Sequence, residues 1–385
     1  MPAAVTVRCG ASPTISEVLQ TTSGRPLTIT VNGTCTENLV ITRDDVTLTG
    51  TSGGAITPAD AALDTIRIDG AKRVIIETLT ITGGATGIRG VHGAAFTVRR
   101  TTIQNAVGAG VAAIYSSQAL IDGNTIQNNA GNGITVDYGS SATITSNTIR
   151  GNRQDGIGVY ETSAARIGLT ETGVAAGNLI EANGADGYDG IELANGAMGY
   201  VYGNTIQANT GSGIGVYRQC VLRLVGGNTI QNNTTGVYVR SSTLGTSLYS
   251  SSAPPDRISG HPGSGIVAEE NASLDLRGGI TITGNWGAGG IFAQHGARIM
   301  MRQTSIIDNN HPNPSGSLPS GILLQLGSSV RFYNPSGTTS PSNTITGNGA
   351  YGLFCVDGES SYIGSSSVQW GGNGSGDQSP NCTGF

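Results

Sequence analysis

The chain of 385 residues has little charge and few aromatic residues. Charged residues make up 12% of the sequence and aromatic residues 5%, whereas 61 residues are glycine. This composition is unlike that of an α/β enzyme. It is also unlike disorder, because 37% of the residues are hydrophobic and isoleucine and valine are spread evenly along the chain. Low charge with abundant Gly, Asn, Ser and Thr favours short strands joined by tight turns.

Two further absences exclude classes of protein. No stretch approaches about 18 consecutive apolar residues, so no segment is predicted to span a membrane. The net charge of −5 argues against nucleic acid as a partner, which would require a basic surface.

Lys72 is the single lysine, so nearly all positive charge is arginine. The chain begins Met-Pro-Ala-Ala without an apolar segment, and we expect that a signal peptide has been removed.

The cysteines also lack the spacing of a metal or redox motif. None of the five belongs to a CxxC pair, which argues against zinc or thioredoxin chemistry. Two lie near the start of the chain and two near its end. We therefore predict the disulfides Cys9–Cys35 and Cys355–Cys382, in a secreted, cell-surface or periplasmic protein. Cys220 remains as a buried free thiol.

Repetition is what the sequence has in abundance. The phrase GNTIQ occurs three times, first at 123–127. Aligned on the glycine before each short strand, three successive coils have 23 residues each, namely 88–110, 111–133 and 134–156. Later coils are mostly longer because of insertions. Self-similarity at such a period is typical of a solenoid.

The first strand of each coil alternates between inward and outward positions. Its third residue is small or apolar, and its first is always aliphatic: Ile66, Ile88, Val111, Ile134, Ile157, Ile191, Ile214, Val237, Ile266, Ile291, Ile322 and Leu353. This period of two describes a strand with one buried face. Turn asparagines recur in register, as Asn124 with Asn147 and Asn129 with Asn152, and predict ladders along a stack of coils.

A unit of two or three short strands cannot bury its own apolar face. Stacking pairs each strand in parallel with its copies in the neighbouring coils, about 4.8 Å away. Propeller blades need about 40 residues, and leucine-rich repeats have another consensus. The sequence therefore predicts an all-β, single-domain parallel β-helix of about 12 coils. We expect an N-terminal cap and first strands at 1–45, coils at 46–352, and a last coil with a C-terminal cap at 353–385.

A capping helix is predicted at 14–20, TISEVLQ. Thr14 is its expected N-cap and Glu17, three residues later, completes a capping box. The apolar side chains of Ile15, Val18 and Leu19 are expected to cover the first coil.

The opening VRCGASPTISEVLQ…LTITVNGTCTENLVITRDDVTLTG and the GNTIQNN coils resemble secreted bacterial right-handed parallel β-helix repeat proteins, the pectate-lyase-like superfamily. The resemblance covers essentially the whole chain and implies fold more strongly than function. Most active members are polysaccharide lyases, glycoside hydrolases and uronan epimerases, while others are adhesins or surface proteins. The NTD…DD…HG…RIK set of polygalacturonases and the DPHD of alginate epimerases are missing. The single lysine argues against a Lys-based pectate-lyase site.

Outward positions of the coils between Ile134 and Val237 are rich in acids, arginines and tyrosines. We interpret this face as a glycan groove around a hollow left by Gly158 and Gly215; the alternative is an ordinary solvated polar face. The candidate catalytic residues are Asp155, Glu161, Asp189 and Glu192. The candidate substrate-binding residues are Asp137, Tyr138, Tyr160, Tyr217, Arg218, Tyr238 and Arg240.

Three functions are open for this face. Two carboxylates, with Asp155 and Asp189 on adjacent coils, favour hydrolysis or transfer of a glycosidic bond in a poly- or oligosaccharide. The same pair could instead bind Ca²⁺, and no other cofactor or metal is indicated. The second function is a uronan lyase or epimerase with Tyr and Arg chemistry. The third is a non-catalytic glycan-binding adhesin or surface protein.

Two features outside the groove also carry expectations. The outward second position of the late coils is apolar at Val267, Phe292, Leu323 and Phe354, which predicts a homo-oligomer or a cover formed by 304–320 and 333–346. His261, in SGHPG, is expected in a solvated insertion loop.

Overall fold

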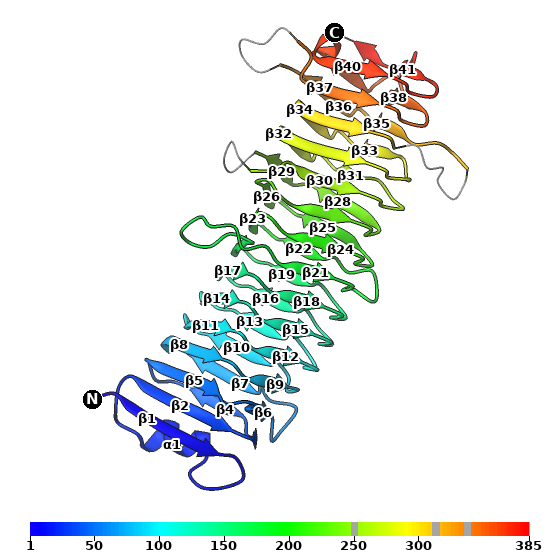
Figure 1. The fold of residues 1–385 in the computed structure, drawn as a ribbon. Helices are drawn as coiled ribbons and strands as arrows, with labels where there is room; N and C mark the ends of the chain where they lie inside the picture. Colours follow the sequence, from blue (N-terminus) through cyan, green and yellow to red (C-terminus); the bar gives the residue numbers. More distant parts are fainter. Residues whose placement is uncertain (248–252, 310–315, 335–339, 385) are drawn as a thin grey trace. The chain divides into compact units, whose positions relative to one another are not determined.

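A computed structural model gives the structure of the chain. It divides into two compact units, Met1–Ile191 and Glu192–Phe385, which are described here one at a time. Both units consist of short parallel strands with almost no helix (Figure 1). Among the residues described, no helix combines the length and hydrophobicity needed to cross a membrane. The described residues are 1–247, 253–309, 316–334 and 340–384.

Unit 1 is a stack of coils whose strands form two sheets, A and B. Sheet B contains β4 (Leu39–Ile41), β7 (Ile66–Asp69), β10 (Ile88–Val91), β13 (Val111–Ala113), β16 (Ile134–Val136) and β19 (Ile157–Val159). Sheet A contains β1 (Ala3–Arg8), β2 (Leu27–Asn32), β3 (Thr34–Thr36), β5 (Val46–Gly50), β6 (Ala55–Thr57), β8 (Lys72–Glu77), β9 (Thr80–Thr82), β11 (Ala95–Arg99), β12 (Thr102–Gln104), β14 (Gln118–Asp122), β15 (Thr125–Gln127), β17 (Ser141–Thr145), β18 (Thr148–Arg150), β20 (Ala164–Ile167) and β21 (Leu179–Glu181).

Unit 2 repeats this plan. Strand β22 (Ile191–Ala194) begins at the last residue of unit 1. Sheet B continues in β25 (Ser212–Tyr217), β28 (Thr235–Arg240), β31 (Ile266–Glu269), β33 (Gly289–Ala293), β35 (Ser320–Leu324), β38 (Tyr351–Cys355) and β41 (Gly376–Gln378). Sheet A contains β23 (Met198–Val201), β24 (Thr205–Gln207), β26 (Val221–Leu224), β27 (Thr229–Gln231), β29 (Thr243–Thr246), β30 (Asp256–Ser259), β32 (Ser273–Thr283), β34 (Arg298–Ile307), β36 (Ser329–Phe332), β37 (Asn343–Thr346), β39 (Ser361–Ile363), β40 (Val368–Gly371) and β42 (Thr383–Gly384), and a 3₁₀ helix follows β39 at Ser365–Ser367.

The strands stack in the predicted register. In unit 1 Ile134 pairs in parallel with Val111 and Ile157, and in unit 2 Val237 pairs with Ile214 and Ile266. Every predicted first-position residue is fully buried. The parallel β-helix is thus confirmed, with about 15 turns over the described residues in place of the expected 12. The difference arises because β4, β41 and the earlier turn of β1, which pairs with β2, lie outside the coils recognised from the repeat.

The N-terminal cap of unit 1 is as predicted. Helix α1 (Ile15–Thr21) has the capping box of Thr14 and Glu17. Its buried Ile15 and Val18 pack toward β2 and β4, whereas Leu19 is only half-buried. The Glu37 carboxylate accepts the N–H groups of Ile15 and Ser16 at 2.9 Å, which satisfies donors at the helix N-terminus.

Both predicted disulfides are present, Cys9–Cys35 in unit 1 and Cys355–Cys382 in unit 2. Cys220 is a buried free thiol, as expected. Its Sγ accepts the Ala197 N–H at 3.1 Å, the role that the Ser140 hydroxyl has toward Ser117 in unit 1. Burial raises the pKa of the Cys220 thiol. This cysteine therefore replaces a structural serine.

Asparagine ladders run through the turns of both units. In unit 1 the Asn147 Oδ1 accepts both the N–H and the side-chain amide of Asn124 at 2.9 Å, and Asn178 does the same for Asn147. A second ladder joins Asn129, Asn152 and Asn183. Each rung satisfies turn backbone that would otherwise be buried without a partner.

The expectation for His261 was wrong. It is fully buried in unit 2, in the ladder that runs from Asn209 through Asn233 to Asn285. Its Nδ1 accepts the Asn233 N–H at 3.2 Å, and its Nε2 lies 3.2 Å from the Ile230 carbonyl. The neutral imidazole with hydrogen on Nε2 thus presents the same acceptor and donor as an asparagine amide.

Candidate functional site

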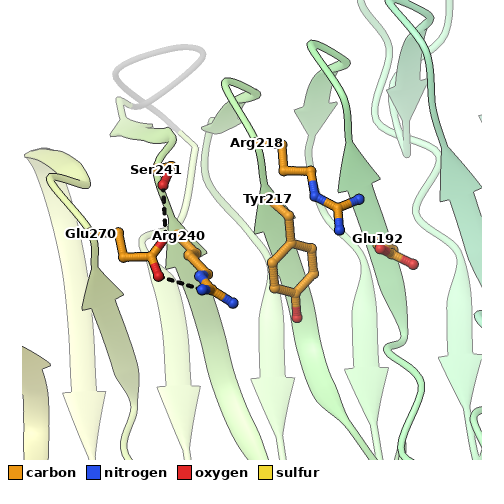
Figure 2. A pocket seen from close by; sticks show the side chains of 6 residues that line it. All are labelled: Glu192, Tyr217, Arg218, Arg240, Ser241 and Glu270. Carbon is orange, nitrogen blue, oxygen red and sulfur yellow. Dashed lines mark hydrogen bonds and ion pairs between the residues drawn. The ribbon is translucent and has the colours of Figure 1, made fainter.

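The outward side of sheet B in unit 2 contains a depression of about 430 Å³ (Figure 2). Four consecutive strands supply its walls: β22 through its second residue, and β25, β28 and β31 through their last residues or the residues that follow them. The lining residues are Glu192, Tyr217, Arg218, Arg240, Ser241 and Glu270. Four of these six were predicted from the sequence as site residues.

Backbone geometry places three of the lining residues at one edge of the sheet. Arg218, Ser241 and Glu270 each follow a sheet B strand and have φ values of 60°, 49° and 53°. This left-handed conformation is unusual for residues other than glycine. It recurs in coil after coil and is held by bonds between coils, such as Arg218 N–H to the Arg240 carbonyl at 3.2 Å. The conformation is therefore a property of the fold, and it aligns successive side chains in a row.

An ion pair forms one end of the depression. The Arg240 guanidinium bonds to the Glu270 carboxylate, which also accepts the Ser241 hydroxyl at 3.1 Å. The hydrogen bond from Arg240 lowers the pKa of Glu270, and the same bond raises the pKa of Arg240. Both groups stay charged across the ordinary pH range, so Glu270 is unsuited to donate a proton.

Two tyrosines lie side by side in this region. The rings of Tyr217 and Tyr238 have centroids 5.5 Å apart and planes tilted by 38°. The Tyr238 hydroxyl donates to the Glu269 carboxylate at 2.5 Å. Burial, followed by this hydrogen bond, raises the pKa of Tyr238. Tyr238 is therefore held as a neutral phenol.

Arg218 is an exposed cation of the depression, as is Arg240, which pairs with Glu270. Figure 2 shows the Arg218 guanidinium extending from the edge of the sheet, in this view between Tyr217 and Glu192. Its Nη1 donates to the Asn195 Oδ1 at 3.4 Å, which is long for a hydrogen bond. A planar guanidinium in this position can bind a carboxylate through two parallel hydrogen bonds.

The predicted acids of unit 1 are arranged differently from the expectation. Asp155 and Asp189 are 1% and 6% exposed, so they are buried turn residues and not outward acids. One Asp155 oxygen accepts the Asp189 N–H at 2.8 Å, and the other accepts the Tyr160 hydroxyl at 2.7 Å. Their carboxylates were expected outward because they precede the strand, but Asp155 instead satisfies the turn backbone.

The predicted hollow at Gly158 is occupied. A Cβ at this residue would lie 2.3 Å from the Tyr160 hydroxyl, because the Tyr160 side chain folds back across the strand. The Asn132 side chain donates to the same hydroxyl at 3.1 Å. Gly158 therefore makes room for Tyr160 and leaves no space for a sugar.

The remaining predicted residues of unit 1 lie along one edge of sheet B. Tyr138 is 51% exposed and stacks on Tyr115, with ring centroids 4.9 Å apart. The Asp137 carboxylate accepts the Tyr138 N–H at 2.7 Å, and burial followed by the charge of Glu161 raises the pKa of Asp137. Glu161 itself is exposed. These residues form a surface row in unit 1, and their role in binding a ligand stays a prediction.

The sequence also missed members of the site. Glu269 and Glu270 occupy the fourth and fifth positions of their coil, and both contact predicted residues of the groove. The sequence feature that could have identified them is the pair of adjacent acids in the coil that follows those assigned to the groove. Within the described residues there is no group of three or more His, Cys, Asp or Glu side chains placed to hold a metal ion.

The apolar column of the late coils is only partly exposed. Val267 is buried, whereas Phe292, Leu323 and Phe354 are half-buried. The Phe354 ring stacks on Tyr351, with centroids 5.5 Å apart. Residues 310–315 and 335–339 of the segments expected as covers lie outside the described residues. Of the described parts, 304–307 belongs to β34 and 343–346 to β37. Homo-oligomerisation through this column remains a prediction.

Comparisons with known proteins agree with the fold. Residues 29–174 match the family model described as the right handed beta helix region. No curated protein sequence matches the chain.

Solved structures are similar over most of the chain. The periplasmic alginate epimerase AlgG matches with a TM-score of 0.54 and 11% identity, over 97% of this chain and 83% of that one. The Dettilon tailspike protein gp208 matches with a TM-score of 0.52 and 17% identity, over 86% of this chain and 62% of that one. At these identities the likeness concerns the fold alone. With the strand register, these likenesses show that the chain has a parallel β-helix fold, and its residues 29–174 match the right-handed form of that fold.

Proposed function

We propose that the depression of unit 2 binds an acidic poly- or oligosaccharide, and that the protein acts on it as a uronan lyase or epimerase. The observation that carries the proposal is the exposed guanidinium of Arg218 beside Tyr217 in one depression. The carboxylate of a uronate suits the planar guanidinium. The rings of Tyr217 and Tyr238 offer an apolar surface for a sugar.

The chemistry follows from these groups. Pairing of Arg218 with the sugar carboxylate neutralises its charge and makes the hydrogen on the adjacent carbon more acidic. Tyr217, after its hydroxyl has given its own proton to solvent, takes up the proton from that carbon as the base. In elimination the electron pair then forms a carbon–carbon double bond while the glycosidic oxygen leaves and takes up a proton. In epimerisation a proton returns to the opposite face of the same carbon. The proton that the leaving oxygen or the carbon takes up comes from solvent, because the Tyr238 hydroxyl is held by Glu269.

Hydrolysis by paired carboxylates has less support in this depression. Its acids, Glu192 and Glu270, lie on strands three coils apart, a backbone separation of about 14 Å at about 4.8 Å per coil. Glycosidases hold their two carboxyl groups about 5 to 9.5 Å apart. Glu270 is also bound to Arg240 and Ser241.

We further propose an extracellular or periplasmic location. The Cys9–Cys35 and Cys355–Cys382 disulfides form and persist in oxidising compartments. The alginate epimerase of similar fold is named as periplasmic.

The test is incubation of the protein with a panel of acidic and neutral polysaccharides. We expect an acidic member to yield either ultraviolet absorbance from unsaturated uronate or an altered ratio of epimers by NMR. Tyr217→Phe should lower the rate at least about 100-fold, because it removes the proton-transferring oxygen. Tyr200→Phe, at an exposed tyrosine of sheet A in the same unit, is the matched control. New reducing ends without unsaturated products would point to hydrolysis instead, and activity retained in Tyr217→Phe would place the site elsewhere.

A further inference from the structure

Sheet B of unit 2 continues past the depression with two aligned sets of outward residues. The first set is the apolar column of paired residues on β31, β33, β35 and β38: Val267, Phe292, Leu323 and Phe354. The second set, the amide row, lies two residues further along the chain and consists of Gln294, Gln325 and, at its end, the carboxylate of Glu269. Phe292 pairs in register with both Val267 and Leu323, so the column is continuous across these strands.

The amide row is a directed chain of hydrogen bonds. Gln325 Nε2 donates to Gln294 Oε1 at 2.6 Å, and Gln294 Nε2 donates to Glu269 Oε1 at 2.5 Å. The other Glu269 oxygen accepts the Tyr238 hydroxyl. The row therefore begins at Tyr238, whose ring lies 5.5 Å from that of Tyr217 in the depression. Each glutamine amide has a second N–H and further acceptor capacity for a ligand.

The exposed surface of the column is narrow and polar on one side. Phe292 and Leu323 are half-buried, and the half-buried amides of Gln294 and Gln325 lie two positions further along the same strands. Planar apolar surface beside neutral amide donors and acceptors matches a sugar ring, which has an apolar face and a rim of hydroxyl groups.

The spacing of the residues also suits a polymer. Equivalent positions on successive coils are about 4.8 Å apart, close to the length of one pyranose residue in an extended chain. A ligand with a similar repeat can therefore meet an equivalent pair of column and row residues at each step.

We propose that the apolar column and the amide row form accessory subsites for sugar residues of a polysaccharide whose reacting unit occupies the depression. This inference rests on the proposed function and adds a preference for long chains. At Phe292, Leu323, Gln294 and Gln325, recognition depends on stacking and amide hydrogen bonds, and not on charge.

A second copy of this chain is the competing occupant of the column. The column is one residue wide, Val267 is buried, and Phe354 is covered in part by Tyr351. A stable dimer needs about 800 Å² from each partner, with a well-packed apolar centre. The exposed parts of three side chains fall short of such a centre.

The experiment measures affinity as a function of chain length. Oligomers of galacturonate and of mannuronate, from disaccharide to octasaccharide, are titrated into the wild type, Phe292→Ala and Gln294→Leu. The matched controls are Tyr200→Ala and Gln231→Leu, which alter an exposed tyrosine and a similar glutamine pair on sheet A of the same unit.

We expect the wild type to bind the long oligomers of one series at least about tenfold more tightly than the short ones. Phe292→Ala and Gln294→Leu should remove most of that gain and leave the affinity for short oligomers unchanged, while both controls match the wild type. Equal affinity for oligomers of all lengths, or equal losses of affinity in the controls, would contradict the accessory subsites. Neither result would contradict binding of an acidic saccharide in the depression.

Two other results are also decisive. If the wild type binds no member of either series, the proposed function fails and the accessory subsites fail with it. If the wild type sediments as a dimer that Phe292→Asp converts to a monomer, the column is an interface between copies and the inference is wrong.

Discussion

The side chain of Tyr160 folds back over Gly158, and its hydroxyl donates to the buried carboxylate of Asp155. Alternation along the strand correctly predicts which residues point inward, because the period of a strand is fixed by its geometry. It does not predict the direction of an acid in the preceding turn. Asp155 could have faced solvent, but the Asp189 N–H and the Tyr160 hydroxyl need its two oxygens.

This arrangement predicts a structural role for Asp155. Asp155→Ala leaves two partly buried donors without their acceptor and should lower the free energy of unfolding by about 1 to 3 kcal/mol. Asp155→Asn keeps one acceptor oxygen and should cost less. Urea denaturation measures both, with Asp186→Asn, at an exposed acid of the same unit, as the control. Equal stability of Asp155→Ala and the wild type would contradict the role.

At the scale of the element, the turn ladders join one coil to the next. The 23-residue spacing of Asn124 and Asn147 predicted them correctly. The rungs at Asp256 and His261 could not be recognised, because an insertion lengthens their coil and moves them out of register with the repeat. Asp256 accepts a hydrogen bond from Asn228 where the ladder would otherwise have an asparagine. His261 does the same for Asn233.

These two rungs give stability opposite dependences on pH. Burial raises the pKa of Asp256 from 3.8 to about 6, and burial lowers that of His261 from 6.5 to about 4. Between pH 4 and 6 the folded chain retains the Asp256 proton that the unfolded chain loses. The contribution of Asp256 to the free energy of unfolding therefore falls as pH rises. Between pH 6.5 and 4, His261 is protonated in the unfolded chain but not in the folded chain. The contribution of His261 to the free energy of unfolding therefore falls as pH falls.

The pH-dependent contributions of Asp256 and His261 to the free energy of unfolding nearly cancel in the wild type. Each single variant removes one of them and leaves the other. Asp256→Asn should raise the free energy of unfolding at pH 7 by about 1 to 3 kcal/mol, because an amide continues the ladder without a buried charge. Relative to the wild type, its stability should then decline as pH falls from 6.5 to 4.

His261→Asn should show the reverse slope, with stability increasing as pH falls toward 4. Denaturant titrations at several pH values, with Asp275→Asn on the exposed side of sheet A as the control, measure these slopes. Parallel pH profiles for all four proteins would contradict the assignment of the two rungs.

At the scale of the whole molecule, the sequence predicted the architecture, the N-terminal capping helix and both disulfides. These follow from local signals: an alternating strand, a capping box and cysteines near the two ends. The site was only half predicted, because side chains on an outward face are not constrained by the core. Tyr217, Arg218, Arg240 and Glu192 do meet in one depression, whereas Asp155 and Asp189 belong to turns.

The central claim is that the depression of unit 2 binds an acidic saccharide through Arg218. The most direct measurement is calorimetric titration of the wild type and Arg218→Ala with an oligouronate and with the same oligomer after reduction of its carboxyl groups. We predict binding of the acidic oligomer alone, weakened by salt and reduced at least about tenfold in Arg218→Ala, while Arg331→Ala on sheet A is unchanged. Equal binding of the acidic and reduced oligomers, or full affinity in Arg218→Ala, would contradict the claim.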